Sequence, residues 1–440
     1  MRVGMLVRLH CCALLSMIAV MGLAQARDRR AVAEPVVPSR ICARLAPSSE
    51  SVTDRLQDAM AHCPAGSAVY LAGGIFLSGP LEMKSGVMLW IERDATLIAL
   101  AQPKAYDKGS GNCGRIGGKG DGCRPFISFF KTRGGGIYGD GIIDGQGGAL
   151  MVGAGESWWQ LARRAQTEGG NQNVPRLIQV DRAQDITFHG ITLRNAPNFH
   201  VAMNRVEGAT FWGVTIDTPA DARNTDGIDP GASQDVTITH CNIRTGDDNV
   251  AIKAGTNGPV RYISIIDNYF GWGHGMSIGS EISSGVSDIL VHGLTLDGTT
   301  SGLRIKSDVS RGGLVERVTY ENVCLRNNRW PIYFDTRYDP QAHGDEIPVY
   351  RQIALRHVRG GDGALVMHGL DLAHPLEIEL EDVRFAESAT WQVENANVVG
   401  SGVWPPLRDG QGRVSPSVWE GCAKALFKTP SKRTIGSVPQ

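Results

Sequence analysis

The stretch DVTITHCNIR, residues 235–244, combines a short β-branched run with a polar turn and a second apolar position. The same pattern recurs in DITFHGITL, GATFWGVTI, YISIIDNYF, DILVHGLTL and RVTYENVCL, residues 185–193, 208–216, 262–270, 288–296 and 317–325. The apolar position after the turn recurs at steps of 23, 27, 27, 26 and 29 residues, at Leu193, Ile216, Ile243, Phe270, Leu296 and Leu325. A period in the twenties predicts a solenoid, in which each coil packs only on its neighbours.

The short strands and polar turns predict an all-β fold, a single-stranded right-handed parallel β-helix whose coils stack about 4.8 Å apart. A leucine-rich repeat would need a regular L-x-x-L-x-L frame, and a propeller would need a longer period with Trp-Asp punctuation. Weaker copies in 134–147 and 378–385 extend the expected solenoid from about residue 65 to about residue 400. The amphipathic stretch 51–62, with Val52, Leu56, Ala59 and Met60 on one face, predicts a short helix that caps the N-terminal end.

The domain organisation expected from the sequence is simple. Residues 1–26 have the pattern of a cleaved signal peptide, with Arg2 and Arg8, an apolar run over 11–23 and an A-x-A site at 24–26. Residues 27–40 are expected to form a linker, 41–425 the β-helix domain and 426–440 a flexible tail. No second apolar stretch has membrane length, which predicts a secreted protein that is not held in a membrane. A capped solenoid needs no partner subunit, so we expect a monomer.

The 440 residues carry a net charge of −1, without the basic excess that nucleic-acid binding requires. An anionic ligand must therefore be bound by local cations.

Seven cysteines remain after the expected cleavage, and export permits disulfides. Cys113 and Cys123 bracket a glycine-rich loop, and Cys42 and Cys63 bracket the expected helix, so each cysteine is predicted to pair with its neighbour. Cys241 takes the repeat position of Ile191, Val214 and Leu294, which predicts a buried, inert thiol. Cys324 falls one place later, facing outward, where it could pair with Cys422 or stay free.

Two adjacent carboxylates, Asp247 and Asp248, stand in TGDDN, residues 245–249. Alone, this is ordinary turn chemistry. However, Asp226 precedes them by 21 and 22 residues, and His274 follows Asp247 by 27. Arg304, in RIK, follows His274 by 30 residues, with Lys306 beside it. The sequence predicts that these six residues gather on one flank of the solenoid, where structural ion pairing is the alternative to a catalytic site.

Paired carboxylates of this kind suit glycoside hydrolysis, in which one carboxyl group donates a proton and another, ionised, activates water. Close packing of like charges separates their pKa values and prepares both roles. Arg304 and Lys306 could bind a sugar carboxylate, which indicates an acidic polysaccharide as the substrate.

NTDGID, GDD, GHG and RIK, in this order, resemble the four motifs of the polygalacturonases, glycoside hydrolase family 28. Within that family, NVAIKAG, GHGMSIGSE and TSGLRIKSD most resemble the bacterial endo-polygalacturonases. The resemblance implies that Asp247 is the proton donor, that Asp226 and Asp248 activate water, and that His274 tunes the donor. It further implies that Arg304 and Lys306 bind substrate, and that α-1,4 bonds of polygalacturonate (pectin) are hydrolysed with inversion, without a metal or cofactor.

Several residues near these motifs are ambiguous. Asn224 could bind substrate and orient Asp226 or simply form a turn, and Tyr338 is a candidate for substrate binding. Lys253 is expected to be a solvated or structural lysine. His200 could lie near the cleft or be a hydrogen-bonded turn residue. Trp158 and Trp159 are expected to pack under a loop.

Other activities remain open at this point. A rhamnogalacturonan or xylogalacturonan hydrolase would use similar chemistry. A pectate lyase would need calcium and a base, and a non-catalytic β-helix would bind pectin without product. No long insertion is recognised in the sequence, which favours endo over exo cleavage.

Overall fold

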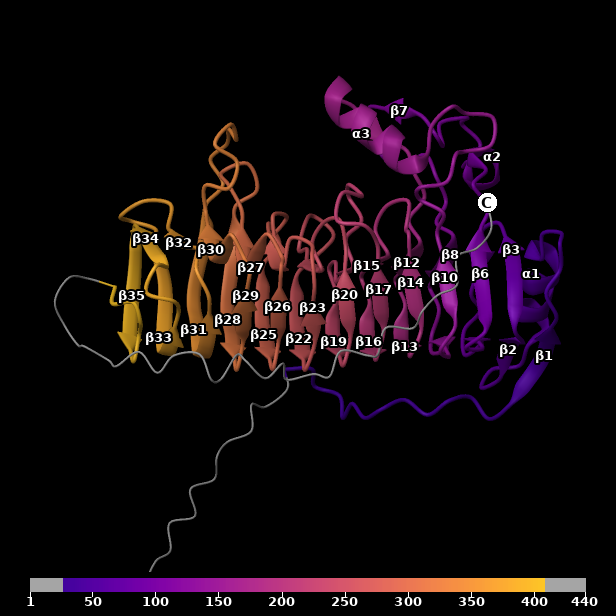
Figure 1. Cartoon of the computed structure of the whole chain (residues 1–440), viewed down its shortest axis with the longest axis horizontal. Helices are drawn as coiled ribbons and strands as arrows, with labels where there is room; N and C mark the ends of the chain where they lie inside the picture. Colours follow the sequence, from indigo (N-terminus) through magenta and orange to yellow (C-terminus); the bar gives the residue numbers. More distant parts are fainter. Residues whose placement is uncertain (1–26, 408–440) are drawn as a thin grey trace, which may run out of the picture.

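The computed structural model describes residues 27–407, so the expected signal peptide, the expected tail and Cys422 lie outside the described residues. The chain winds into a right-handed parallel β-helix, as the repeat predicts. Its strands form three ladders that run the length of the molecule (Figure 1).

Two of the ladders belong to one large sheet. The first contains β1 (Ile41–Leu45), β2 (Ala68–Leu71), β5 (Met88–Ile91), β9 (Gly136–Tyr138), β13 (Gln184–His189), β16 (Glu207–Trp212), β19 (Gln234–Thr239), β22 (Val260–Ile266), β25 (Val286–His292), β28 (Gly313–Glu321), β31 (Pro348–Gly360), β33 (Leu376–Arg384) and β35 (Ala396–Ser401). The second contains β3 (Gly74–Ser78), β6 (Ala95–Ala99), β10 (Ile142–Asp144), β14 (Thr192–Arg194), β17 (Thr215–Asp217), β20 (Asn242–Arg244), β23 (Tyr269–Phe270), β26 (Thr295–Asp297) and β29 (Cys324–Arg326).

The third ladder is a separate sheet of 11 strands, called here the cleft sheet. It contains β4 (Leu81–Glu82), β8 (Ile127–Phe130), β12 (Ile178–Asp181), β15 (Val201–Asn204), β18 (Ile228–Asp229), β21 (Val250–Ile252), β24 (Met276–Gly279), β27 (Ser301–Lys306), β30 (Trp330–Asp335), β32 (Ala364–His368) and β34 (Thr390–Glu394).

The register of the coils follows the repeat in the sequence. Ile216 pairs with Leu193 and with Ile243, and the same column continues through Phe270, Leu296 and Leu325. The turn before this column has positive φ in every one of these coils, from Gly190 (74°) to Asn322 (53°). Residues that tolerate this conformation are therefore favoured there, which explains the recurrent glycine, asparagine and aspartate.

The predicted inward column forms part of the core. Ile191, Val214 and Leu294 are buried, and Cys241 is a buried free thiol, as expected. Cys324 is also buried, so the prediction that it faces outward is wrong. It lies on β29, the last strand of the second ladder, and is covered by β31, where Arg359 pairs with it. It is disulfide-bonded.

The N-terminal end is covered by α1 (Thr53–His62), which buries Leu56 and Met60, with Val52 buried just before it. The predicted disulfides Cys42–Cys63 and Cys113–Cys123 are both present. Residues 27–30, expected to be part of a linker, lie against the large sheet: Asp28 is buried and accepts a hydrogen bond from Thr237 (2.8 Å).

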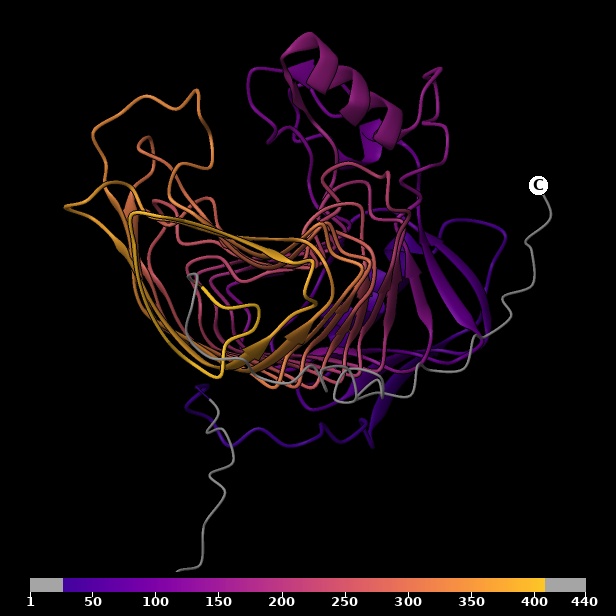
Figure 2. The same cartoon turned by 60° about the vertical axis from the view of Figure 1, so that its left-hand side comes forward.

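Two segments rise beyond the same edge of the β-helix, apart along its axis (Figures 1 and 2). The first raised segment, residues 145–177, holds α3 (Trp158–Glu168) and β11 (Asn171–Gln172), which pairs antiparallel with β7 (Ile116–Gly117) near α2 (Pro103–Tyr106). The second raised segment is residues 336–347, between β30 and β31. Neither segment is recognised from the sequence. The capping box of Ser157 and Gln160 was the missed helix signal.

Candidate active site

The strand register brings Asp226, Asp248 and His274 into one column. Each stands two residues before a strand of the cleft sheet, and Ile228 pairs with Val250, which pairs with Met276. Parallel coils in register place equivalent residues above one another, about 4.8 Å apart. The predicted gathering of these residues is therefore observed.

Arg304 and Lys306 reach this column from another part of the sheet. Arg304 pairs with Ser277 and Lys306 with Gly279, so both stand beyond the register position of His274 along the strand. Both cations lie on β27 and flank the buried Ile305, as the alternation in RIK predicts. Their long side chains extend back toward Asp248, because a strand presents alternate side chains on the same face.

Asp248 is the most enclosed carboxylate of the site. Lys306 Nζ lies 2.9 Å from its Oδ2, and Arg304 Nη1 (3.3 Å) and Ser277 Oγ (2.7 Å) donate to its Oδ1. Burial opposes its ionisation, but Lys306 and Arg304 hold the pKa of Asp248 well below its usual range. Asp248 is therefore ionised across the working range of almost any enzyme.

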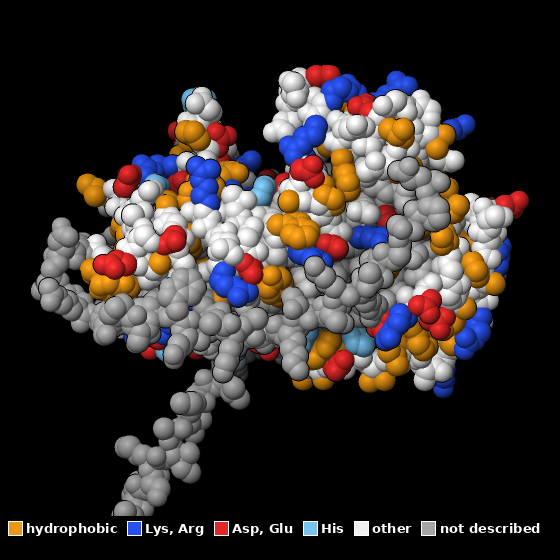
Figure 3. All heavy atoms as spheres, in the orientation of Figure 1, with side chains coloured by type: hydrophobic (Ala, Val, Ile, Leu, Met, Phe, Trp, Pro, Cys, Tyr) orange, Lys and Arg blue, Asp and Glu red, His pale blue; other side chains and the backbone are white. Residues whose placement is uncertain are grey.

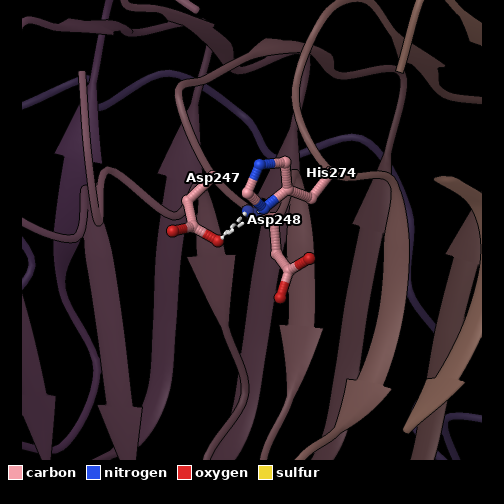
Figure 4. A group of neighbouring side chains, drawn as sticks. All are labelled: Asp247, Asp248 and His274. Atoms are coloured by element: carbon pink, nitrogen blue, oxygen red, sulfur yellow. Dashed lines mark hydrogen bonds and ion pairs between the residues drawn. The ribbon is translucent and has the colours of Figure 1, made fainter. Parts of the chain in front are cut away.

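Asp247 and His274 point toward one another, whereas the carboxylate of Asp248 points away from them (Figure 4). His274 Nδ1 lies 3.0 Å from Asp247 Oδ1, which also accepts from the backbone N–H of Asp248 at 2.9 Å. Burial is the largest influence and raises the pKa of Asp247, but the hydrogen bond to His274 and the electrostatic attraction of His274 and Lys306 together exceed it, so the net pKa is lowered. The side chain of Asp247 is 20% exposed, against 4% for Asp226 and 2% for Asp248.

Asp226 belongs to a buried group that the sequence reasoning did not assemble. Lys253 Nζ lies 3.1 Å from Asp226 Oδ2 and 2.9 Å from Asp229 Oδ2. Burial raises the pKa of Asp226 well above its ordinary value and that of Asp229 to about 6, against the opposing charge of Lys253. The pKa values do separate, as expected, but the raised one belongs to Asp226 and not to Asp247.

Lys253 is thus a structural, paired lysine, and its reading as a solvated one is excluded. The register alone would not have found this group, because Lys253 pairs with Gly231, two residues after Asp229. Only the reach of its side chain brings Nζ to Asp226 and Asp229.

Asn224 and Tyr338 border the site differently. Asn224 adopts φ 56°, and its Oδ1 accepts from Gln172 Nε2 at 2.9 Å, which ties the first raised segment to this turn. Asn224 is therefore a turn residue, and its side chain anchors the first raised segment, which forms a wall of the site. The ring of Tyr338, in the second raised segment, lies 5.3 Å from the Arg304 guanidinium and 5.4 Å from Lys306 Nζ.

His200, Trp158 and Trp159 are packing residues. His200 is fully buried between the carbonyl oxygen of Asp226 (3.0 Å) and Thr218 Oγ1 (2.7 Å), and burial lowers its pKa to about 4. His200 is therefore a neutral imidazole that supports the backbone of Asp226. Trp158 is buried in α3, and Trp159 Nε1 donates to the carbonyl of Ala196 at 2.9 Å.

A hollow separates the two raised segments on the face shown in Figure 3. Beyond Lys306 the sheet continues with Asp335 and His368 in the same register. These two residues help to line a pocket of about 500 Å³ under the second raised segment.

A metal ion is geometrically conceivable at the same site. Ligand atoms of Asp247, Asp248 and His274 lie within 4.8 Å of one another. However, both oxygens of Asp248 already contact Lys306, Arg304 and Ser277. An added cation would face these two positive charges, so the donor set does not fit a resident metal well.

A coiled scaffold with a row of acids and cations along one sheet defines the class of polysaccharide-acting β-helix enzymes. Residues 68–402 match the glycosyl hydrolases family 28, and the chain belongs to that family and is a glycosidase. It is 44% identical over 380 residues to an endo-polygalacturonase of Pectobacterium parmentieri, covering 85% of this chain and 94% of that protein. It is 39% identical to a polygalacturonase of Ralstonia solanacearum, covering 74% and 73%.

A solved structure gives the same result. A polygalacturonase from Erwinia carotovora ssp. carotovora superposes with a TM-score of 0.82 at 43% identity, covering 84% of this chain and 100% of that one. Within residues 27–407, no helix is long and apolar enough to cross a membrane.

Proposed function

We propose that the protein is a secreted endo-polygalacturonase, which hydrolyses α-1,4-galacturonosidic bonds inside polygalacturonate chains. The observation that carries this proposal is the convergence of Asp226, Asp247 and Asp248 with Arg304 and Lys306 on one sheet. An enzyme that hydrolyses a chain of acidic sugars needs carboxylates that perform the hydrolysis and cations that bind the carboxylate of the sugar. The names of the relatives support the same substrate.

Asp247 is assigned as the proton donor. It is the most exposed of the three catalytic carboxylates, so it can reach the leaving oxygen, and only its Oδ1 is occupied by His274 and the Asp248 N–H. The hydrogen bond to His274 lowers the pKa of Asp247 in the free protein, and a bound sugar that excludes water would raise it. His274 acts as the positioning residue of the donor.

Asp226 and Asp248 are assigned to the water. Asp248 is held ionised by its two cations, whereas Asp226 retains a proton more readily. We therefore assign the permanent negative charge to Asp248 and the exchange of the water proton to Asp226. Arg304 and Lys306 bind the sugar carboxylate at the cut, with Tyr338 beside them. Asn224 is assigned to the edge of the substrate path, where it is joined to the first raised segment.

Inversion of the anomeric centre is carried over from the family resemblance. Retaining glycosidases hold their two carboxyl groups about 5 Å apart, and inverting ones hold them roughly 6.5–9.5 Å apart, with water between. Proton NMR of the first-formed product tests this assignment, because inversion yields the β-anomer before mutarotation.

Endo cleavage requires a cleft open at both ends. A hollow lies between the two raised segments, which supports passage of a long chain over the cleft sheet. An exo enzyme, or a hydrolase of rhamnogalacturonan or xylogalacturonan, is the second candidate. The protein is further proposed to be a monomer that needs no cofactor.

One assay tests the reaction type. Polygalacturonate is incubated in EDTA while reducing ends, viscosity and the ultraviolet absorbance of unsaturated products are followed together. An endo-hydrolase lowers viscosity rapidly without an absorbance rise. Reducing ends with slow viscosity loss would indicate exo cleavage, and an EDTA-sensitive absorbance rise would indicate a lyase. Pectin binding without any product would indicate a non-catalytic β-helix.

A further inference from the structure

Arg176 occupies the column of the catalytic acids on the cleft sheet. It stands two residues before β12, and backbone hydrogen bonds place it above Phe199, which lies above Asp226. Leu177 N donates to the carbonyl of Phe199 at 3.0 Å, and His200 N donates to that of Asp226 at 2.8 Å. Arg176 is therefore two coils from Asp226, about 9.6 Å along the axis.

The guanidinium of Arg176 is partly buried but is not neutralised. Nη1 donates to Gln179 Oε1 at 3.3 Å, and the group lies 5.6 Å from the ring centre of Phe199. Among residues 27–407, no carboxylate lies at ion-pair distance from it. Burial lowers its pKa, against the attraction of Asp229 and Asp226 further away. A partly buried cation without a close counterion is unfavourable in the free protein, which an anionic ligand would relieve.

The position of Arg176 complements that of the known cations. Arg304 and Lys306 lie one coil beyond His274, whereas Arg176 lies on the opposite side of the acids. Lys253, whose side chain reaches back toward the coil of Asp226, is already bound to two carboxylates and lies 4.4 Å from the Phe199 ring centre. A chain of acidic sugars that runs along the axis would place carboxylates on both sides of the cut.

We propose that Arg176, supported by Gln179, binds the carboxylate of a galacturonate unit on the side of the cleaved bond opposite to Arg304 and Lys306. This site rests on the proposed polygalacturonase function. Binding at Arg176 would make the enzyme select an unesterified sugar on that side of the cut, in addition to the one bound by Arg304 and Lys306. The reason is that a methyl ester offers no negative charge to the guanidinium.

The test compares Arg176→Gln with the wild type on galacturonate oligomers of increasing length. Oligomers long enough to reach Arg176 should lose roughly 10- to 100-fold in kcat/KM, mainly through KM, the range for a hydrogen bond to a charged group. Oligomers too short to reach it should be cleaved as by the wild type. The variant should also discriminate less between polygalacturonate and partly methyl-esterified pectin, and Arg176→Lys should retain part of the discrimination.

Arg261→Gln is the matched control. Arg261 also donates to a glutamine, Gln234 Oε1 at 3.1 Å, but lies on β22 of the large sheet, away from the cleft. An equal loss on short and long oligomers, or no loss on any, would overturn the site at Arg176. If Arg176→Gln does not fold, Arg176→Lys and Arg176→His replace it in the test. The site at Arg176 is then overturned if both variants show the length dependence and the ester discrimination of the wild type. A wild type that does not cleave polygalacturonate would overturn the proposed function itself.

Discussion

Lys306 Nζ lies 2.9 Å from Asp248 Oδ2, although the two residues are 58 positions apart in the chain. Both side chains are buried, with 9% and 2% of their surface exposed. This ion pair joins the coil that carries Asp247 and Asp248, two of the proposed catalytic carboxylates, to the coil that carries Arg304 and Lys306, the proposed substrate-binding cations. The integrity of the site and the stability of these coils therefore depend on each other.

Lys306→Met should destabilise the protein by about 3–5 kcal/mol, because it leaves a buried carboxylate without its closest cation. Urea unfolding monitored by tryptophan fluorescence measures the change. The double variant Lys306→Met/Asp248→Asn should recover part of the loss, since the orphaned charge is removed as well. A double variant that is less stable than Lys306→Met would contradict this interpretation.

Asp247→Asn should reduce hydrolysis of polygalacturonate by roughly 10²–10⁴-fold, the typical contribution of a general acid or base. The rate of reducing-end release gives the effect, and an unchanged unfolding midpoint shows that the fold is retained. Asp288→Asn is the control, because Asp288 lies on β25 of the large sheet, away from the cleft sheet, and pairs there with Arg317 of β28. If Asp226→Asn abolished activity while Asp247→Asn retained it, the proton donor would be Asp226, whose pKa is the raised one.

Asp229 should make the fold less stable as the pH rises. Burial raises its folded-state pKa to about 6 from an ordinary 3.8, so the folded state holds this proton more tightly than the unfolded chain. Its contribution is complete below the unfolded pKa and is lost as the pH rises through about 6, up to about 3 kcal/mol. Asp248, whose pKa is lowered, acts in the opposite direction and only at lower pH.

Asp229→Asn has no charge to gain, so its stability should fall less between about pH 4 and about pH 7 than that of the wild type. Urea unfolding across this range measures both slopes. Equal slopes would mean that Asp229 does not titrate there, and that Lys253 keeps it ionised throughout.

Removal of divalent cations should leave activity unchanged. Asp247, Asp248 and His274 could offer ligands to an ion, but Lys306 and Arg304 already neutralise Asp248. Dialysis against EDTA followed by the reducing-end assay gives the result. A loss that added calcium restores would place a metal at the acids and require a different mechanism.

The sequence alone determined the fold and the membership of the site. Parallel coils stack in register, so the column from Leu193 to Leu325 and the motifs around Asp226, Asp247 and His274 could be aligned by counting residues. The buried position of Cys241 followed from the same periodicity, and the cysteine pairs near the N-terminus followed from the short segments that each pair brackets.

Only the tertiary structure decided which groups touch and which carboxylate holds a proton. Arg304 is displaced along its strand from His274 and reaches Asp248 through the length of its side chain. Lys253 bridges Asp226 and Asp229, and α3 rises from a connection that has no repeat signal. Periodicity specifies which backbone positions are adjacent, but side-chain reach and desolvation depend on the three-dimensional surroundings of each group, and these set the ion pairs and the pKa values.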